Sequence, residues 1–285
     1  MLFGANMREF DVKLLTAAVR RMAYESCIIL PLDIHAQLKL ARAGEDGITA
    51  RSILDDLLEN AALAQEKSVP ICQDTGMVQI HLRIGREVHF QGDPYAAIQE
   101  GVRQAYTENY LRKSIVADPL RRINTGDNTP AMIYTELIPG DQVQVSLSVK
   151  GFGSENMSRL AMLRPADGVE GVIEFVLRTV RDAGPNPCPP IVVGVGIGGN
   201  FDKVAYLAKL ALLRPLAHRH PDPYYAELEI EMLRQINELG LGPMGLGGRS
   251  TALGVAIETL PTHIAGLPVA VNISCHATRH LEEVL

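Results

Sequence analysis

The first third of the chain repeats hydrophobic residues at the spacing of amphipathic helices. This pattern predicts helices over residues 11–27, 48–67 and 94–111, the last with Pro94 in its first turn. The faces expected to be buried in the first two helices are formed by Leu14, Leu15, Ala18, Val19 and Met22, and by Ile53, Leu54, Leu57, Leu58 and Leu63.

The middle of the chain changes to the two-residue period that is typical of strands. Residues 131–138 and 141–150 are predicted to be two strands joined by a turn at Pro139 and Gly140. In the second strand the aliphatic residues alternate with polar ones; they are Val143, Val145, Leu147 and Val149. This alternation predicts an antiparallel strand with one buried face.

The second half of the chain contains further helices and strands. Helices are expected over residues 168–184, 200–213 and 224–240, and strands over residues 191–197, 251–259 and 268–274. Gly184 is expected to end the first of these helices. We therefore predict an α/β fold of mixed sheets flanked by helices, forming one domain over residues 1–285 that could have two lobes.

A glycine-rich stretch follows the buried strand predicted at residues 191–197. Gly194, Gly196 and Gly199 fit G-x-G-x-x-G, the pattern of dinucleotide-binding turns. Such a turn needs a second parallel strand after the helix, whereas here the helix leads into a loop and another helix. Two different roles for the glycines stay open: they allow a tight turn with close backbone packing, or they shape the wall of a site around Cys188.

Composition and charge argue against several classes of function. The 285 residues are 47% hydrophobic and 21% charged, as in an ordinary globular protein. The net charge of −6 argues against a nucleic-acid surface, which would need clustered Lys and Arg. No run approaches the roughly 18 apolar residues of a membrane span, and the N-terminus shows no signal peptide. The expected location is the cytoplasm.

Four cysteines stand apart in the sequence, and three of them adjoin rigid or polar segments. Cys72 precedes two polar residues, Cys188 lies among prolines, and Cys275 follows an apolar run. A buried apolar thiol is the simplest interpretation of each one alone, and Cys27, after an amphipathic helix, is expected in the core. Three separated thiolates can also hold an iron–sulfur cluster with one iron left open for Lewis-acid chemistry.

Several long segments carry a likeness more specific than any of these short patterns. They are PICQDTGMVQIHLRIG, NTGDNTPAMIYTELIPGD, KGFGSENMSRLAML, NPCPPIVVGVGIGGNFDKVAYLAKLALLRP and HIAGLPVAVNISCHATRH. Together and in this order they resemble the class I (iron–sulfur) fumarases and the related L-tartrate dehydratases. The resemblance implies the α-subunit fold of the two-subunit form, which is that of the N-terminal domain of single-chain fumarases. It also implies reversible hydration of fumarate to L-malate.

The resemblance also implies a cofactor and a set of site residues. By motif position, a 4Fe-4S cluster would be held by Cys72, Cys188 and Cys275. Asp74 would be catalytic, and the substrate-binding residues would be Gln73, Arg112, Gly153 and His263. The guanidinium of Arg112 suits a carboxylate, because it can donate two parallel hydrogen bonds. Phe152 departs from the family pattern, since a third glycine is expected there.

Each of these polar residues also has a simpler interpretation. Asp74, before Thr75 and Gly76, is typical of a turn; Arg112, at a predicted helix end, could compensate the helix dipole; and His263 could be an ordinary loop histidine. Three functional alternatives also stay open. They are the α subunit of an L-tartrate dehydratase, a nicotinamide-dependent oxidoreductase that uses the glycine turn, and a non-catalytic subunit with a structural cluster.

The resemblance has consequences for partners. Single-chain relatives continue into a second domain, whereas this chain stops at Leu285. We therefore expect a separate β subunit, in a closed α2β2 assembly. The expected substrate is a small dicarboxylate, and neither nucleic acid nor a membrane is expected to bind.

Overall fold

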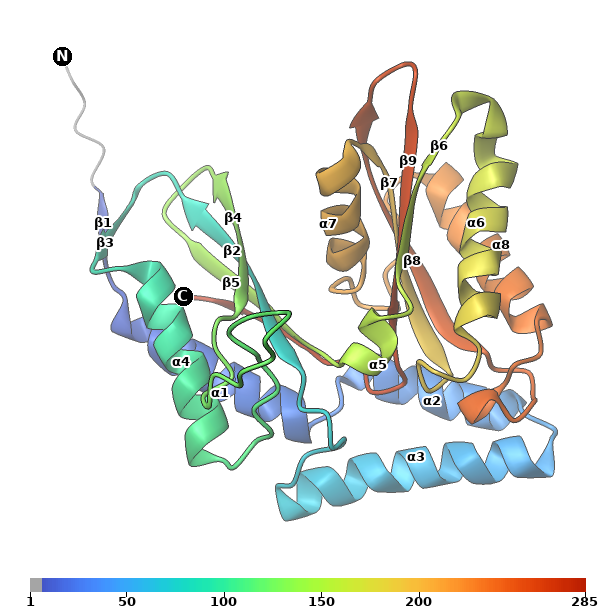
Figure 1. Cartoon of the computed structure of the whole chain (residues 1–285), viewed down its shortest axis with the longest axis horizontal. Helices are drawn as coiled ribbons and strands as arrows, with labels where there is room; N and C mark the ends of the chain where they lie inside the picture. The colour runs from blue at the N-terminus through green and yellow to red at the C-terminus, as the bar shows by residue number, and fades with distance from the viewer. Residues whose placement is uncertain (1–6) are drawn as a thin grey trace. The chain divides into compact units, whose positions relative to one another are not determined.

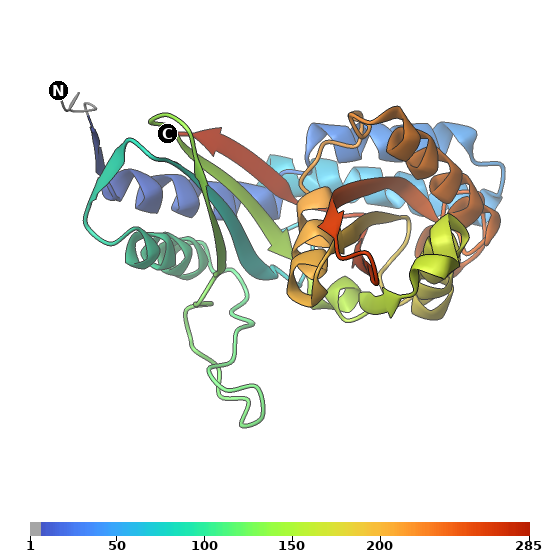
Figure 2. The same ribbon diagram turned by 90° about the horizontal axis from the view of Figure 1, so that it is seen from above.

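The computed structural model describes residues 7–285, which form two compact units (Figure 1, Figure 2). Unit 1 comprises residues 7–29, 64–150 and 279–285, and unit 2 comprises residues 30–63 and 151–278. Both units combine helices with a four-stranded sheet, which confirms the predicted α/β class with mixed sheets flanked by helices.

Unit 1 packs two helices against a four-stranded sheet in the order β10, β5, β2, β4. Strand β2 is parallel to β4 and antiparallel to β5 and so joins the two halves of the sheet. Two further short strands, β1 and β3, form a parallel pair of their own. The elements are β1 (Arg8–Asp11), α1 (Lys13–Ile28), β2 (Met77–Gly85), β3 (Val88–Gln91), α4 (Pro94–Glu108), β4 (Met132–Ile138), β5 (Val143–Lys150) and β10 (His280–Val284).

The core of unit 1 lies between α1, α4 and one face of the sheet. Its α1 residues include Leu15, Val19 and Met22, which are separated by four and three positions and so form one stripe of the helix. Leu14 falls off that stripe and is 50% exposed, so its predicted burial is wrong. Strand β5 alternates buried and half-buried residues as predicted, and Cys27 is fully buried in this core.

Of two predictions about the middle of the chain, one is confirmed and one needs correction. The strands at 132–138 and 143–150 are joined by a turn as predicted, and β2 lies between them in the sheet. The helix predicted to reach residue 111 ends at Glu108. It ends because Tyr110 has a positive φ of 54°, and the Asn109 side chain donates a hydrogen bond back to the Ala105 carbonyl.

Unit 2 is built around a sheet in the order β6, β9, β7, β8, in which β7 is parallel to β8 and antiparallel to β9. Helix α7 covers one face of this sheet, and α6 and α8 cover the other (Figure 1). The elements are α2 (Leu32–Gly44), α3 (Ile48–Lys67, whose last turn belongs to unit 1), α5 (Phe152–Glu155), β6 (Arg159–Leu163), α6 (Gly168–Ala183), β7 (Ile191–Gly199), α7 (Phe201–Ala211), α8 (Pro223–Glu238), β8 (Ala252–Thr262) and β9 (Leu267–Ser274).

Helices α3 and α6 agree closely with the sequence pattern. Helix α3 begins and ends at the predicted residues, and Leu54 and Leu57 are buried as expected. Leu63 is 40% exposed, because the buried stripe continues instead through Ala61 and Ala64. Gly184 caps α6 with a positive φ of 54°, which confirms its predicted role.

The glycines of β7 serve close packing of backbones. Gly194 and Gly196 lie inside the strand, on the face covered by α7, and not in a phosphate-binding turn. A Cβ on Gly194 would lie 2.2 Å from the Ala208 carbonyl oxygen, and one on Gly196 would lie 2.2 Å from the Val204 carbonyl oxygen. This confirms the predicted packing role and removes the basis for a dinucleotide-binding turn.

Replacing Gly196 by alanine should therefore destabilise unit 2. The added methyl group meets the α7 backbone, which cannot move aside as a flexible side chain would, so Gly196→Ala should lower the free energy of unfolding by at least about 1–3 kcal/mol. Urea unfolding measures the change. The matched control is Gly44→Ala, at the end of α2, where a Cβ meets nothing within 4 Å. The control should alter stability by less than about 1 kcal/mol, and equal losses in both variants would contradict the packing argument.

Candidate functional site

In unit 1, the loop from Cys72 to Gly76 is fixed by buried polar groups beneath it. The Tyr106 hydroxyl donates to the carbonyl oxygens of Thr75 and Gly76, the latter at 3.1 Å. The Asn128 side-chain amide donates to the same Gly76 oxygen at 3.1 Å. Both side chains are fully buried, and burial raises the pKa of the Tyr106 hydroxyl far above its usual value, so that it stays protonated as a donor.

The polar residues of this loop lie next to the Cys72 sulfur. The Asp74 backbone N–H donates to Cys72 Sγ at 3.4 Å, and the Cys72 thiol lies 3.4 Å from the Gln73 side-chain oxygen. Asp74 Oδ1 accepts from the Gly76 N–H at 2.9 Å, so Asp74 also forms the turn that its sequence context predicted. The Cys72 sulfur therefore lies among polar groups of its own loop.

Arg112 adjoins the same loop. Its carbonyl oxygen accepts a hydrogen bond from the Thr75 hydroxyl at 3.0 Å, which ties the segment after α4 to the Cys72 loop. Arg112 lies four residues beyond the end of α4 and is exposed. Within residues 7–285 no ion pair engages its guanidinium, which leaves the group available to bind an anion. The structure thus brings Cys72, Asp74 and Arg112 together in unit 1.

Cys27 differs from the other three cysteines. It is fully buried, and its thiol donates to the Thr75 carbonyl oxygen at 3.8 Å. Desolvation raises the pKa of this thiol, so it stays protonated. Cys72 and Cys275 are partly exposed, Cys188 is exposed, and none of the four cysteines forms a disulfide.

In unit 2, Cys188 and Cys275 lie at the same end of the sheet. Cys188 precedes β7, Cys275 follows β9, and these strands are antiparallel neighbours, with Val192 paired to Ser274. The next residue, His276, reaches back to Cys188: its ring Nδ1 lies 3.0 Å from the Cys188 carbonyl oxygen.

The backbone around Cys188 is constrained. Its φ is +54°, in the left-handed region that residues other than glycine rarely adopt. Its N–H donates to the Pro185 carbonyl oxygen at 3.0 Å. Gly153, in α5, faces the same loop, because a Cβ there would lie 3.7 Å from the Asn186 carbonyl oxygen. Strained backbone of this kind is typical of functional sites.

His263 is placed differently from the other predicted site residues of unit 2. It lies in the exposed turn between β8 and β9, at the end of the sheet opposite to Cys188 and Cys275. The turn is closed by a hydrogen bond from the Gly266 N–H to the His263 carbonyl oxygen at 2.9 Å. The structure therefore separates His263 from the two cysteines and Gly153 of its own chain.

Over residues 7–285, no three His, Cys, Asp or Glu side chains gather closely enough to hold a metal ion by themselves. Cys72 belongs to unit 1, and Cys188 and Cys275 belong to unit 2. No sequence pattern identifies Tyr106, Asn128 and His276 as supports of these loops. Asn128 lies in one of the segments that carry the resemblance, but nothing local assigns it a partner more than fifty residues away.

The fold and these two groups of residues suit an α/β enzyme subunit, and comparison with known proteins specifies the class. The family model described as fumarate hydratase (Fumerase) matches residues 16–284. The putative L(+)-tartrate dehydratase subunit alpha of Methanocaldococcus jannaschii is 44% identical over 262 residues, which cover 90% of this chain and 92% of that protein. The L(+)-tartrate dehydratase subunit alpha of Escherichia coli strain K12 is 33% identical over 254 residues, covering 88% and 84%.

These matches define a hydro-lyase subunit. The chain belongs to the fumarate hydratase (Fumerase) family. In the part of the chain that the structure describes, no helix is both long and apolar enough to cross a membrane.

The different surroundings of the four thiols predict different reactivities. In the reduced, metal-free chain, iodoacetamide should modify Cys188, Cys72 and Cys275 well before Cys27, which is buried and has a raised pKa. Peptide mass spectrometry after timed quenching measures the order. All four should react at similar rates in denaturant, and rapid native modification of Cys27 would contradict its place in the core.

Proposed function

We propose that this chain is the α subunit of an enzyme that reversibly hydrates fumarate to L-malate. The observation that carries the proposal is the family match over residues 16–284, and the partly or fully exposed motif cysteines agree with it. The second candidate is dehydration of L-tartrate to oxaloacetate, which the names of the relatives favour. We place fumarate first because GSEN, at residues 153–156, resembles the fumarase form of this motif.

The proposed cofactor is a 4Fe-4S cluster held by Cys72, Cys188 and Cys275. The donor set suits it, because none of the three cysteines is in a disulfide and soft thiolate ligands select iron–sulfur clusters. When bound, a cluster with three protein ligands supplies an open iron that acts as a Lewis acid on the departing hydroxide.

Three residues of unit 1 and Gly153 of unit 2 have proposed roles in holding substrate and moving a proton. The free guanidinium of Arg112 would bind one carboxylate of the dicarboxylate through paired hydrogen bonds. Asp74 would take part in transfer of the C3 proton, directly or through a partner residue. A general base must lie within hydrogen-bonding distance, roughly 2.6–3.2 Å, of the group whose proton it removes. Gln73, exposed beside Cys72, and Gly153, through its backbone, would contact substrate.

We further propose a separate β subunit and an α2β2 assembly. Support comes from the relatives, whose names describe them as alpha subunits and which this chain spans over most of their length. We also propose that residues 1–285 act as one functional domain, because the family match runs through both units without interruption.

Cluster ligation is tested by single serine substitutions. Cys72→Ser, Cys188→Ser and Cys275→Ser should each lose bound iron and activity, because a hydroxyl is a poor ligand for a soft site. Cys27→Ser is the control and should keep its iron. Iron content is measured after anaerobic reconstitution, and a full complement of iron in Cys188→Ser would refute the assignment.

The carboxylate contact is tested by a charge-preserving change. Arg112→Lys keeps the positive charge but loses the planar pair of donors. This loss should reduce transition-state stabilisation by about 2–3 kcal/mol, which lowers kcat/KM roughly 30- to 150-fold. Arg121→Lys, in the same loop region, is the control. Kinetics of Arg112→Lys within twofold of the wild type would remove Arg112 from the site.

The proposed activity is tested on the complex reconstituted anaerobically with the β subunit. Both fumarate hydration and L-tartrate dehydration are assayed on one preparation, and the higher kcat/KM identifies the substrate. The isolated α chain should bind iron but work poorly, because half of the proposed site wall is missing. Inactivity on both substrates, with no substrate-induced change in the cluster's visible spectrum, would favour a non-catalytic subunit.

A further inference from the structure

Helix α5 carries Gly153 but has little of its own to hold it in place. It is a single turn of four residues, and a helix this short is not stable by itself. Only Ser154 is buried within it, and Phe152 is 42% exposed, so apolar burial within α5 contributes little to its position. The place of Gly153 beside the Cys188 loop therefore depends on contacts between α5 and the rest of unit 2.

Glu155, the last residue of α5, makes such contacts in two directions. One carboxylate oxygen accepts a hydrogen bond from the Lys209 ammonium group of α7. The other accepts a hydrogen bond from the side-chain amide of Asn272 in β9 at 2.7 Å. The side chains of Glu155 and Lys209 are only 20% and 16% exposed, so solvent screens this ion pair weakly. Hydrogen bonds to charged groups are also stronger than those between neutral groups.

Both partners of Glu155 belong to rigid elements of unit 2. Lys209 is part of α7, whose backbone packs closely against β7. Asn272 lies three residues before Cys275. Its amide also donates to Ser158 Oγ at 2.8 Å, and the Ile273 N–H donates to the same oxygen at 3.2 Å. The carboxylate thus ties α5 to the end of the sheet that carries the cysteines.

The amide of Asn272 is arranged for this contact. Asn272 is 5% exposed, and its Oδ1 is buried without a hydrogen-bond partner among the described residues. An apolar side chain would avoid the cost of burying that oxygen, so stability alone does not explain an amide here. The opposite orientation of the amide would place its oxygen against the Glu155 carboxylate, with two acceptors facing each other.

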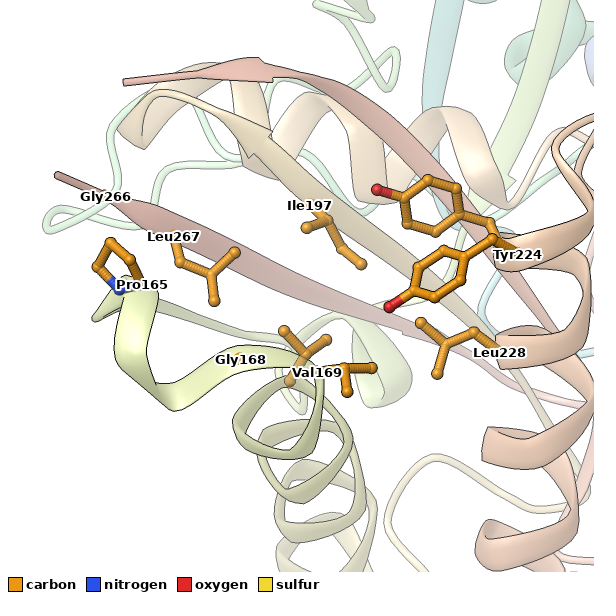
Figure 3. Close-up of a pocket in the computed structure, with 10 residues that line it drawn as sticks. Pro165, Gly168, Val169, Ile197, Tyr224, Leu228, Gly266 and Leu267 are labelled. Carbon is orange, nitrogen blue, oxygen red and sulfur yellow. The ribbon is translucent and has the colours of Figure 1, made fainter. Parts of the chain in front are cut away.

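Unit 2 has a cavity beside each face of its sheet, and the two cavities differ in character. The cavity of about 270 Å³ at α6 and α8 is lined mostly by apolar residues, such as Val169, Leu228 and Leu267 (Figure 3). The cavity of about 190 Å³ beside α7 has Glu155 and Lys209 in its lining. Because space adjoins the ion pair, close packing does not hold α5 on that side, and the polar contacts must do so.

We propose that Glu155 is a positioning residue for the substrate site. Held by Lys209 and Asn272, it fixes α5 and so sets the backbone of Gly153 against the Cys188 loop. The inference rests on the proposed function, which assigns Gly153 a contact with substrate. Glu155 acts through that backbone and has no contact with substrate of its own in this proposal.

Glu155→Gln tests the proposal with a side chain of nearly equal volume. The variant has one acceptor oxygen in place of two, so it loses either the Lys209 or the Asn272 contact. In the complex reconstituted with the β subunit, KM for the active dicarboxylate should rise roughly tenfold while kcat stays within about threefold, because a binding contact is displaced. A KM within about twofold of the wild type would overturn the proposal, whatever the change in kcat.

Lys209→Met tests the same contact from α7 and leaves the sequence of α5 unaltered. It should raise KM as Glu155→Gln does, whereas Lys209→Arg keeps the charge and should keep KM within about threefold. Because the two side chains act as a unit, the double variant should raise KM by less than the product of the two separate effects. Lys203→Met is the matched control, since Lys203 is exposed on the same helix with its ammonium over the Tyr206 ring. A rise in KM in the control equal to that in Lys209→Met would contradict the proposal.

Hydrogen exchange of the same complex gives a readout that needs no activity. In Glu155→Gln, peptides covering residues 151–157 should exchange at least about fivefold faster, while those of β7 and β9 should match the wild type. Iron content should also match, because the cysteines are unaltered. Faster exchange throughout unit 2 with an unchanged KM would show a role in stability alone and would overturn the positioning role.

The two proposals can fail separately. A wild-type complex inactive on both fumarate and L-tartrate would refute the proposed function, and hydrogen exchange would still decide whether Glu155 fixes α5. If the wild type is active but exchange of residues 151–157 is unchanged in Glu155→Gln, the positioning role is overturned while the proposed function stands.

Discussion

The close approach of α7 to β7 is the constraint on which unit 2 depends. Carbonyl oxygens of the helix occupy the space where side chains at positions 194 and 196 would lie, so no side-chain layer separates the two backbones there. One face of the sheet is thereby committed to α7, and the larger apolar residues, such as Val193 and Val195, must face α6 and α8. The antiparallel pairing of β7 and β9 then brings Cys188 and Cys275 to one end of the sheet.

Unit 1 fixes its part of the candidate site by a different means. The Cys72 loop has no regular structure, and its backbone carbonyls would be unsatisfied if buried without donors. Tyr106 and Asn128 supply those donors from the core. A functional loop held by buried polar side chains can be both irregular and rigid, which a site needs if it is to hold a small ligand in one orientation.

The sequence could predict those parts of the molecule that are encoded locally. Both ends of helix α3 could be predicted, because the hydrophobic period of a helix continues through its twenty residues. The role of Gly184 could be predicted because a helix end often needs a residue with positive φ. Strand pairing was not predictable, since nothing local tells β2 to lie between β4 and β5. Nor did the pattern reveal β10, whose five residues include Glu282 and Glu283 and which forms an edge.

The candidate site also has parts that the sequence could predict and parts that it could not. The resemblance identified the motif cysteines and Asp74 as candidates. The exposure of the three cysteines agrees with a role in binding a cofactor. The supports Tyr106 and Asn128 could not be named, because their partners are distant in sequence. The separation of His263 from Cys275 could have been inferred, since the strand predicted over residues 268–274 lies between them.

The pairing of β10 with β5 has a consequence for how the polypeptide folds as it leaves the ribosome. Unit 2 contains residues up to 278, whereas the sheet of unit 1 needs residues 280–284 to cover the edge of β5. Unit 2 can therefore fold while the edge of unit 1 is still bare, although most of unit 1 is synthesised earlier. Until residues 280–284 are in place, β5 offers unpaired N–H and C=O groups to any neighbouring nascent chain, which makes this edge a site of misassembly.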